Sequence, residues 1–263
     1  MNSLIDTLPI AAIALLLLVA LCAVAEFAGR WRRRGGDGGE TNYAASAAVS
    51  LLALMISFTF SVSLNRYDAR RDLVVEEAAA IGMVWQRAKL LREPTRSTVE
   101  TTLRAYIDRR LDYFQQDRLT DRTRPSDGAS RAMRLRLWSV ADELNASGTQ
   151  PLTTRALIDA LTRMDDAAAR RESMAREHIP LMVIDLLIVF SLIAAAILGY
   201  TGAVHGRVTR AANWAFFLLV TLSIMLVLDL DRPRTGLVIV SQLPMKELEA
   251  IMDAPEPVIA LER

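Results

Sequence analysis

Long apolar stretches alternate with strongly charged segments along this chain. Four stretches approach or exceed the roughly 20 apolar residues that a helix needs to cross a hydrocarbon core of about 30 Å. They cover residues 8–28, 43–64, 179–204 and 211–228. Glu26 and Asp185 are the only ionisable acidic or basic side chains within them. The pattern predicts four transmembrane helices.

The first apolar stretch has two possible interpretations. Ala23-Val24-Ala25 resembles a signal-peptide cleavage site, but no Lys or Arg precedes the stretch, and an arginine-rich segment at residues 30–34 follows it. These flanks favour a retained span over a cleaved signal. Residues 35–39 are almost entirely glycine and predict a turn between two antiparallel spans.

The second apolar stretch runs into a charged region without a helix breaker. The segment SFTFSVSLNRYDARRDLVVEE at residues 57–77 begins apolar, ends charged and contains neither Gly nor Pro. We therefore expect one helix that leaves the membrane and continues to about Leu91, before Glu93-Pro94. A continuous helix couples two parts of a protein rigidly, which suits a pore wall or a transmitted signal.

The charged region at residues 65–178 shows helical periodicity throughout. Apolar residues recur at a spacing of three or four and are interpreted as core positions: Leu103, Ile107, Leu111, Phe114, Met133, Leu137, Val140, Leu144, Leu157, Leu161, Met164 and Ala168. Ser97 and Glu100 fit a capping box and predict a helix start at Ser97. No segment has a strand pattern. The predicted fold is all-α, with membrane helices at 1–64 and 179–228, a soluble helical domain at 65–178 and a C-terminal segment at 229–263.

The composition of the chain and its lack of known motifs exclude several classes of function. The formal net charge is +1, which argues against a nucleic-acid partner. Cys22 is the single cysteine, so no disulfide forms within the chain, and His178 and His205 lie far apart in sequence. The sequence contains no phosphate-binding loop, nucleophile elbow or zinc-protease motif. We predict no enzymatic activity and assign no catalytic residue, cofactor or metal site.

Several acidic residues could nevertheless have a role. Glu76-Glu77, and Asp165-Asp166 ahead of Arg170-Arg171, have the spacing of solvated ion pairs on a helix surface. An acidic residue within a span, such as Asp185, usually faces protein or water. It is either a pore-side or relay carboxylate, or the structural partner of an arginine or a backbone donor. Asp229 and Asp231 could help to bind a cation, but capping or pairing is favoured.

Four short segments occur together in a familiar order, and the chain resembles the bacterial bestrophin-like membrane proteins. Phe58-Thr59-Phe60 followed by NRYDARR resembles the segment in which the family's pore helix becomes charged, and Ile179-Pro180 resembles its I-P at the third span. DRPRTG at residues 231–236 and Leu243-Pro244-Met245 resemble its D-P-F-G and L-P-L segments. The matching positions are Asn65, Arg66, Asp68, Arg70, Ile179, Pro180, Asp231, Pro233, Gly236 and Pro244.

The resemblance implies a homo-oligomer, pentameric in the family, with an anion-conducting, chloride-type pore on its axis and the second span at its neck. Leu51, Met55, Phe58 and Val62 share one face of that span. They would form an apolar ring that gates by dewetting, unless this face packs against the other spans. The expected partners are the lipid bilayer, further copies of the chain and small anions. The alternative function is a non-conducting scaffold or signalling module whose helical domain binds a partner.

Two arguments about orientation disagree. The arginines at residues 30–34 predict a cytoplasmic first loop. More basic residues, however, lie near the span ends on the opposite side, where the helical domain is attached. We therefore expect a bacterial inner-membrane protein with its helical domain and both termini in the cytoplasm.

Overall fold

The structure is a computed structural model that describes residues 10–35, 42–116, 128–177, 179–203, 206–231 and 238–254. Four residues singled out above, His178, His205, Pro233 and Gly236, lie outside these ranges.

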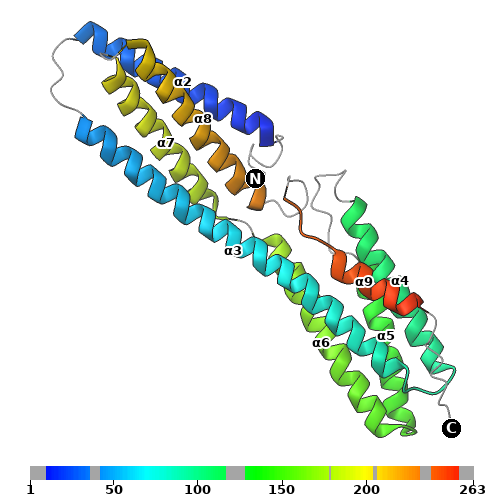
Figure 1. Cartoon of the computed structure of the whole chain (residues 1–263). Coiled ribbons are helices and arrows are strands. Elements are labelled where there is room, and N and C mark those ends of the chain that lie inside the picture. The colour runs from blue at the N-terminus through cyan, green and yellow to red at the C-terminus, as the bar shows by residue number, and fades with distance from the viewer. Residues whose placement is uncertain are drawn as a thin grey trace, which may run out of the picture. The chain divides into compact units, whose positions relative to one another are not determined.

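Across the described residues, the regular structure is entirely α-helical, so the predicted all-α class is confirmed. The helices are α2 (Ile10–Gly35), α3 (Asn42–Ala88), α4 (Thr95–Gln116), α5 (Gly128–Ser147), α6 (Pro151–Arg176), α7 (Leu181–Gly202), α8 (Gly206–Asp231) and α9 (Leu243–Asp253). The apolar segments of α2, α3, α7 and α8 belong to the four helices that are long and apolar enough to cross a membrane. Figure 1 labels these helices along the chain.

The chain divides into two units by its internal contacts. The first, called here the membrane unit, contains residues 1–67 and 178–239, and the second, the helical unit, contains residues 68–177 and 240–263. Helix α3 runs through the boundary after Tyr67 without interruption, as the absence of a breaker predicted. The C-terminal helix α9 belongs to the helical unit.

In the membrane unit, α2 packs closely against α7 and α8, and these two also pack against each other (Figure 1). Their shared core contains Leu21, Leu187, Phe217 and Ile224, each at most 2% exposed. At the crossing of α2 and α7, a Cβ atom on Gly199 would lie 2.1 Å from the carbonyl oxygen of Ala25. Small residues are therefore required at this crossing, as is common where membrane helices approach closely.

The membrane half of α3 joins this bundle through side chains rather than through close backbone packing. Leu52, Thr59 and Ser63 are buried on its packed side. The hydroxyl of Thr59 donates to the carbonyl of Met55 at 2.8 Å, and that of Ser63 donates to the carbonyl of Thr59 at 3.0 Å. Both hydroxyls are thus satisfied within the helix, which allows them to be buried in apolar surroundings.

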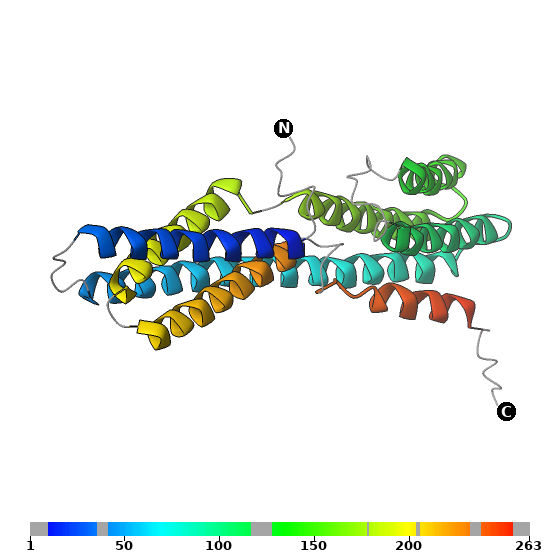
Figure 2. The same cartoon turned by 90° about the horizontal axis from the view of Figure 1, so that it is seen from above.

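In the helical unit, α5 packs against α4 and α6, while α9 packs against α4. Figure 2 shows α9 beside the second half of α3, where a Cβ atom on Gly82 would lie 3.4 Å from the side chain of Leu248. Most of the predicted core stripe is buried: Leu103, Ile107, Leu111, Leu137, Leu144, Leu157, Leu161, Met164 and Ala168. Met133 and Val140 are half-buried, and the side chain of Phe114 lies outside the described part.

The predicted capping box at Ser97 is wrong. Helix α4 begins two residues earlier, at Thr95. The backbone N–H of Ser97 donates to the Glu93 carboxylate at 3.3 Å, and the Ser97 hydroxyl donates to the carbonyl of Pro94 at 2.8 Å. Glu100 instead pairs with Arg96 at 2.8 Å. Because Glu93 already satisfies an amide of the first turn, Ser97 lies inside the helix.

Candidate permeation helix and buried charge cluster

The four residues of α3 that were predicted to line the neck of a pore differ in solvent exposure. Phe58 is 65% exposed and Leu51 is 46% exposed, whereas Met55 and Val62 are half-buried. Met55 packs against the apolar core of the membrane unit. The structure therefore separates the predicted set into two open positions and two partly covered ones.

A further apolar residue, Leu54, lies open one turn before Phe58 and is 66% exposed. Ser50, Ser57 and Ser61 are exposed on the same side of the helix, opposite the buried Leu52, Thr59 and Ser63. Leu54 was not included among the predicted pore-lining residues, because the sequence does not show which side of α3 packs against the other spans. The spacing of four residues between Leu54 and Phe58 was the available signal.

Two of the segments that resemble the family meet near the end of α8: Asp231 of the DRPRTG segment contacts Ile179, which lies just before α7. Both carboxylate oxygens of Asp231 accept the backbone N–H of Ile179, at 3.1 and 3.2 Å, across 52 residues of sequence. Asp229 accepts the N–H of Val238 at 2.9 Å. Both aspartates are buried. This is the backbone-capping role that the sequence favoured over cation binding.

The other family-like positions are distributed over both units. Asn65 and Asp68 are exposed on α3, Arg66 is half-buried, and Arg70 is 5% exposed and donates from Nη2 to the carbonyl of Glu177 at 2.7 Å. Pro180 is exposed just before α7. Pro244 is half-buried in the first turn of α9.

Asp185 is exposed in the second turn of α7. Within the described ranges, no side chain of its own chain forms an ion pair or hydrogen bond with it. A carboxylate in such a position requires water, headgroups or another protein chain. Its functional role stays a prediction.

The helical unit contains a buried cluster of charges around Glu77 of α3, which is fully buried. Arg110 of α4 donates from Nη2 to Glu77 Oε2 at 2.8 Å, and Arg171 of α6 donates from Nη1 to the same oxygen at 2.5 Å. The hydroxyl of Tyr106 donates to the other carboxylate oxygen at 2.8 Å. One carboxylate thus connects α3 with α4 and α6.

The cluster continues beyond this carboxylate. Arg171 also donates to the side chain of Gln242 at 2.6 Å, immediately before α9. Arg134 of α5 lies 3.3 Å from Glu172 and 3.0 Å from Asp165. The Trp138 indole N–H donates to Asp165 at 2.5 Å. Charged side chains therefore connect α3, α4, α5 and α6 and reach the residue before α9.

These contacts correct the interpretation of the acidic pairs as solvated helix-surface pairs. Glu77 is buried, and Glu76 pairs with Arg170 of another helix at 2.9 Å. Arg171 binds Glu77 rather than an aspartate of its own helix. The i, i+4 spacing suggested local partners, but Glu76, Glu77 and Asp165 pair with side chains of other helices, whereas Asp166 is exposed.

The electrostatics of Glu77 follow from its surroundings. Burial by itself raises the pKa of this carboxyl, but the charges and hydrogen bonds of Arg110 and Arg171 outweigh it and lower the pKa from 4.5 to about 2. Burial and the adjacent Glu77 carboxylate raise the pKa of Tyr106, so its hydroxyl remains a neutral donor. The cluster is a permanently ionised structural connection at neutral pH.

The described residues contain no group of three or more His, Cys, Asp or Glu side chains placed to hold a metal ion. The long helix α3 has an exposed apolar face in the membrane unit, and its Glu77 forms the buried charge cluster in the helical unit.

The fold is similar to that of solved membrane proteins. A crystal structure of a variant of a bacterial bestrophin homologue from Klebsiella pneumoniae is 17% identical, with a TM-score of 0.70 over 91% of this chain and 96% of that chain. A second structure of the Klebsiella pneumoniae homologue is 17% identical, with a TM-score of 0.69 over 92% and 97%. A variant described only as a membrane protein is 14% identical, with a TM-score of 0.70 over 92% and 97%. At these identities the likeness concerns the fold.

No curated protein matches the chain. The bestrophin-like domain matches it over residues 10–245, from the first residue of α2 into α9. Because this match covers both units and most of the sequence, the chain belongs to the bestrophin-like family.

Proposed function

We propose that this protein is an anion channel of the bacterial inner membrane in which identical copies, five by the family resemblance, surround a single pore lined by α3. Family membership and fold support a bestrophin-type channel. The observation that carries the assignment of α3 is its open face, on which Leu54 and Phe58 are 66% and 65% exposed. The helical unit and both termini are assigned to the cytoplasm.

The composition of this face suits a narrow, water-accessible neck. Leu54 and Phe58 are separated by one helical turn, so a ring of each would give two successive apolar constrictions. Ser50, Ser57 and Ser61 are exposed beside them. The serine hydroxyls beside the large apolar side chains offer water hydrogen-bonding positions along this face, which supports the proposed pore position.

The other spans already have partners within one chain. Helices α2, α7 and α8 pack closely on one another, whereas α3 joins them through side chains alone. A helix with one loosely covered face is available for contact with copies of itself around an axis. Anions rather than cations are proposed because of the family resemblance.

The test combines oligomeric mass with ion flux. Purified protein is expected to elute as an oligomer and to mediate halide flux in liposomes. Leu54→Ala and Phe58→Ala each remove part of an apolar constriction and are expected to increase the flux severalfold. Leu219→Ala is the matched control, because Leu219 is 63% exposed on α8 and lies on a helix that is not assigned to the pore.

Three results would decide against the proposal. Flux that both α3 variants leave unchanged would remove α3 from the neck. An equal increase in the Leu219 variant would assign the effect to general loosening of the membrane unit. Absence of halide flux in liposomes, together with a monomeric mass, would favour the alternative function as a scaffold or signalling module.

One observation supports the alternative function as a scaffold or signalling module. Leu135 and Leu152 of the helical unit are 64% and 85% exposed, and exposed leucines of this kind could contact a protein partner. If liposomes are silent, Leu135→Ser and Leu152→Ser should weaken capture of that partner while leaving the oligomeric mass unchanged.

A further inference from the structure

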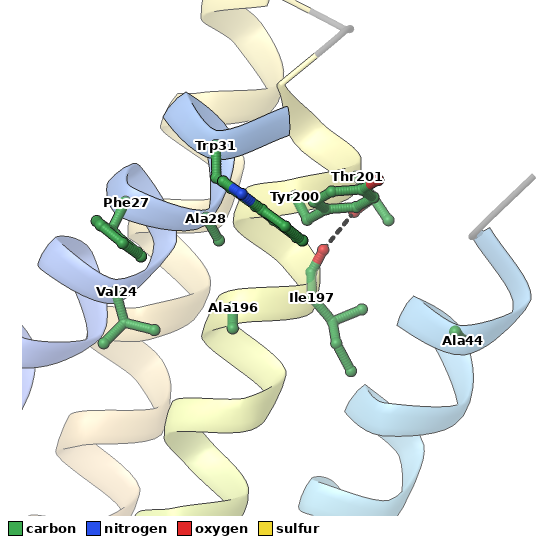
Figure 3. A pocket seen from close by; sticks show the side chains of 9 residues that line it. All are labelled: Val24, Phe27, Ala28, Trp31, Ala44, Ala196, Ile197, Tyr200 and Thr201. Atoms are coloured by element: carbon green, nitrogen blue, oxygen red, sulfur yellow. Dashed lines mark hydrogen bonds between the residues drawn. The ribbon is translucent and has the colours of Figure 1, made fainter. Parts of the chain in front are cut away.

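An apolar pocket lies at the end of the membrane unit where α2 and α7 finish and α3 begins. Its volume is about 410 Å³, within the range of about 300–1,000 Å³ that is usual for ligand sites. Figure 3 shows Phe27 and Trp31 of α2 and Tyr200 of α7 around it, with Ala196 and Ala44 at its floor and side. The Thr201 hydroxyl is already donated to the carbonyl of Ile197 at 3.0 Å. The pocket therefore suits an apolar ligand.

The rim of the pocket carries aromatic residues of the kind found at the membrane–water interface. Trp31 and Tyr200 have ring centroids 6.1 Å apart at its rim, and Tyr43 and Trp214 lie near the same ends of α3 and α8. Tryptophan and tyrosine concentrate at the membrane–water interface because one end of each side chain is apolar and the other is polar. Phe27 is 74% exposed and Trp31 is 68% exposed, so the opening faces the surroundings of the unit.

The helix that forms one wall of the pocket ends in positive charge. The guanidinium of Arg32 lies 4.7 Å from the Tyr200 ring centroid and donates to the Tyr200 carbonyl at 3.0 Å, which holds it against the rim. Arg30 and Arg34 are exposed. By helical spacing they follow Phe27 and Trp31 by three residues on the same side of α2. Neither has an ion-pair partner within the described residues.

We propose that this pocket binds an anionic phospholipid, with an acyl chain between α2, α3 and α7 and the phosphate group at Arg30 and Arg34. A soluble anion would use the arginines but not the apolar pocket, and an uncharged lipid would use the pocket but not the arginines. An anionic phospholipid matches both, because the arginines attract its phosphate by charge while the pocket accepts an acyl chain. With both termini assigned to the cytoplasm, this end of α2 lies in the opposite leaflet. The proposal does not depend on ion conduction.

Trp31 reports directly on the occupant of the pocket. The Trp214→Phe variant leaves Trp31 as the only tryptophan in the membrane unit, since Trp85 and Trp138 belong to the helical unit. The full-length variant is reconstituted into phosphatidylcholine vesicles that contain brominated phosphatidylglycerol or an equal fraction of brominated phosphatidylcholine. Brominated chains quench tryptophan on contact. Stronger quenching by the phosphatidylglycerol is expected.

The arginine variants test the charge contribution. Arg30→Gln and Arg34→Gln are each expected to reduce the preference for the anionic lipid about fivefold, the usual effect of one basic residue near an anionic surface. Arg87→Gln with Arg92→Gln is the charge-matched control, because both arginines are exposed in the helical unit, and it should keep the preference. Ala196→Phe should reduce quenching by both lipids because its ring fills the pocket.

Equal quenching of Trp31 by the two lipids would overturn the proposed selectivity. Absence of quenching by either lipid would show that protein, such as a neighbouring copy of the chain, covers the pocket, and would overturn the proposal altogether. A preference that survives the double change of Arg30 and Arg34 would remove the phosphate site from the end of α2. Retention of phosphatidylglycerol by the purified protein in native mass spectrometry is an independent supporting result.

Discussion

At the scale of single residues, Glu77 is a buried charge with several specific partners. It is fully buried, yet two guanidinium groups and a phenol satisfy its carboxylate. Breaking such an arrangement from one side leaves uncompensated buried charge, which costs far more than losing a surface pair. The role of Glu77 is therefore to hold the helices of the helical unit together.

The low pKa of Glu77 makes the stability of the helical unit depend on pH. The carboxyl has a pKa of about 2 when folded and 4.5 when unfolded, so its stabilising contribution is complete above pH 4.5 and is lost as the pH falls toward 2. The contribution at neutral pH is on the order of 3 kcal/mol. Urea titration followed by tryptophan fluorescence at several pH values should show this loss.

Glu77→Gln should remove most of that pH dependence and destabilise the unit by a few kcal/mol, on the order of 3. Glu76→Gln is the matched control, since Glu76 pairs with Arg170 at the surface and should contribute below about 1 kcal/mol. Equal effects of the two substitutions would contradict the special role of the buried carboxylate.

At the scale of elements, the crossing of α2 and α7 determines how closely the spans pack. Gly199 and Ala25 allow the two backbones to approach, because a Cβ atom on Gly199 would meet the Ala25 backbone. The same elements form the pocket proposed to hold lipid, with Ala196 one turn from Gly199. Small residues on α7 therefore serve both the helix crossing and the pocket.

Gly199→Ala should destabilise the membrane unit, since the new methyl group forces α2 and α7 apart. Overpacking of this kind costs about 1–3 kcal/mol. Thermal unfolding of the purified protein should shift to lower temperature. Gly128→Ala is the control, because a Cβ atom there would meet nothing within 4 Å. An unchanged unfolding temperature for Gly199→Ala would mean that the crossing is looser than described.

At the scale of the whole molecule, α3 is the one helix among the described residues that contributes to both units. Its first part carries the open face with Leu54 and Phe58, and its second part carries the anchored Glu77. Because α3 is continuous, the face assigned to the pore and the buried Glu77 lie on one helix. Within the membrane unit, the hydrogen bonds from the Ile179 amide to Asp231 join the chain just before α7 to the end of α8.

The assignment of the helical unit to the cytoplasm leads to a labelling prediction. Asp142→Cys places a thiol at an exposed position of α5 in that unit. In intact spheroplasts, a membrane-impermeant maleimide should leave this cysteine unlabelled, and labelling should appear after permeabilisation. The unsubstituted chain, in which Cys22 lies in a span, provides the background. Labelling of intact spheroplasts would reverse the orientation.

The sequence by itself determined the class of this protein, the number of spans and the continuity of α3. These properties depend on local physics, because a span needs a certain length of apolar helix and a helix ends where a breaker or a cap stands. The backbone-capping preference of Asp229 and Asp231 was also within reach, since carboxylates beside a helix end commonly accept backbone amides.

Only the tertiary structure decided which side of α3 is open and which charges are buried. Met55 and Leu54 are neighbours of similar character, and packing against the bundle alone separates the covered residue from the open one. The partner of Glu77 on α6 lies 94 residues away, whereas the sequence pattern suggested local pairs. Long-range contacts of this kind leave no periodic signal, because each side chain is placed by the packing of several helices at once.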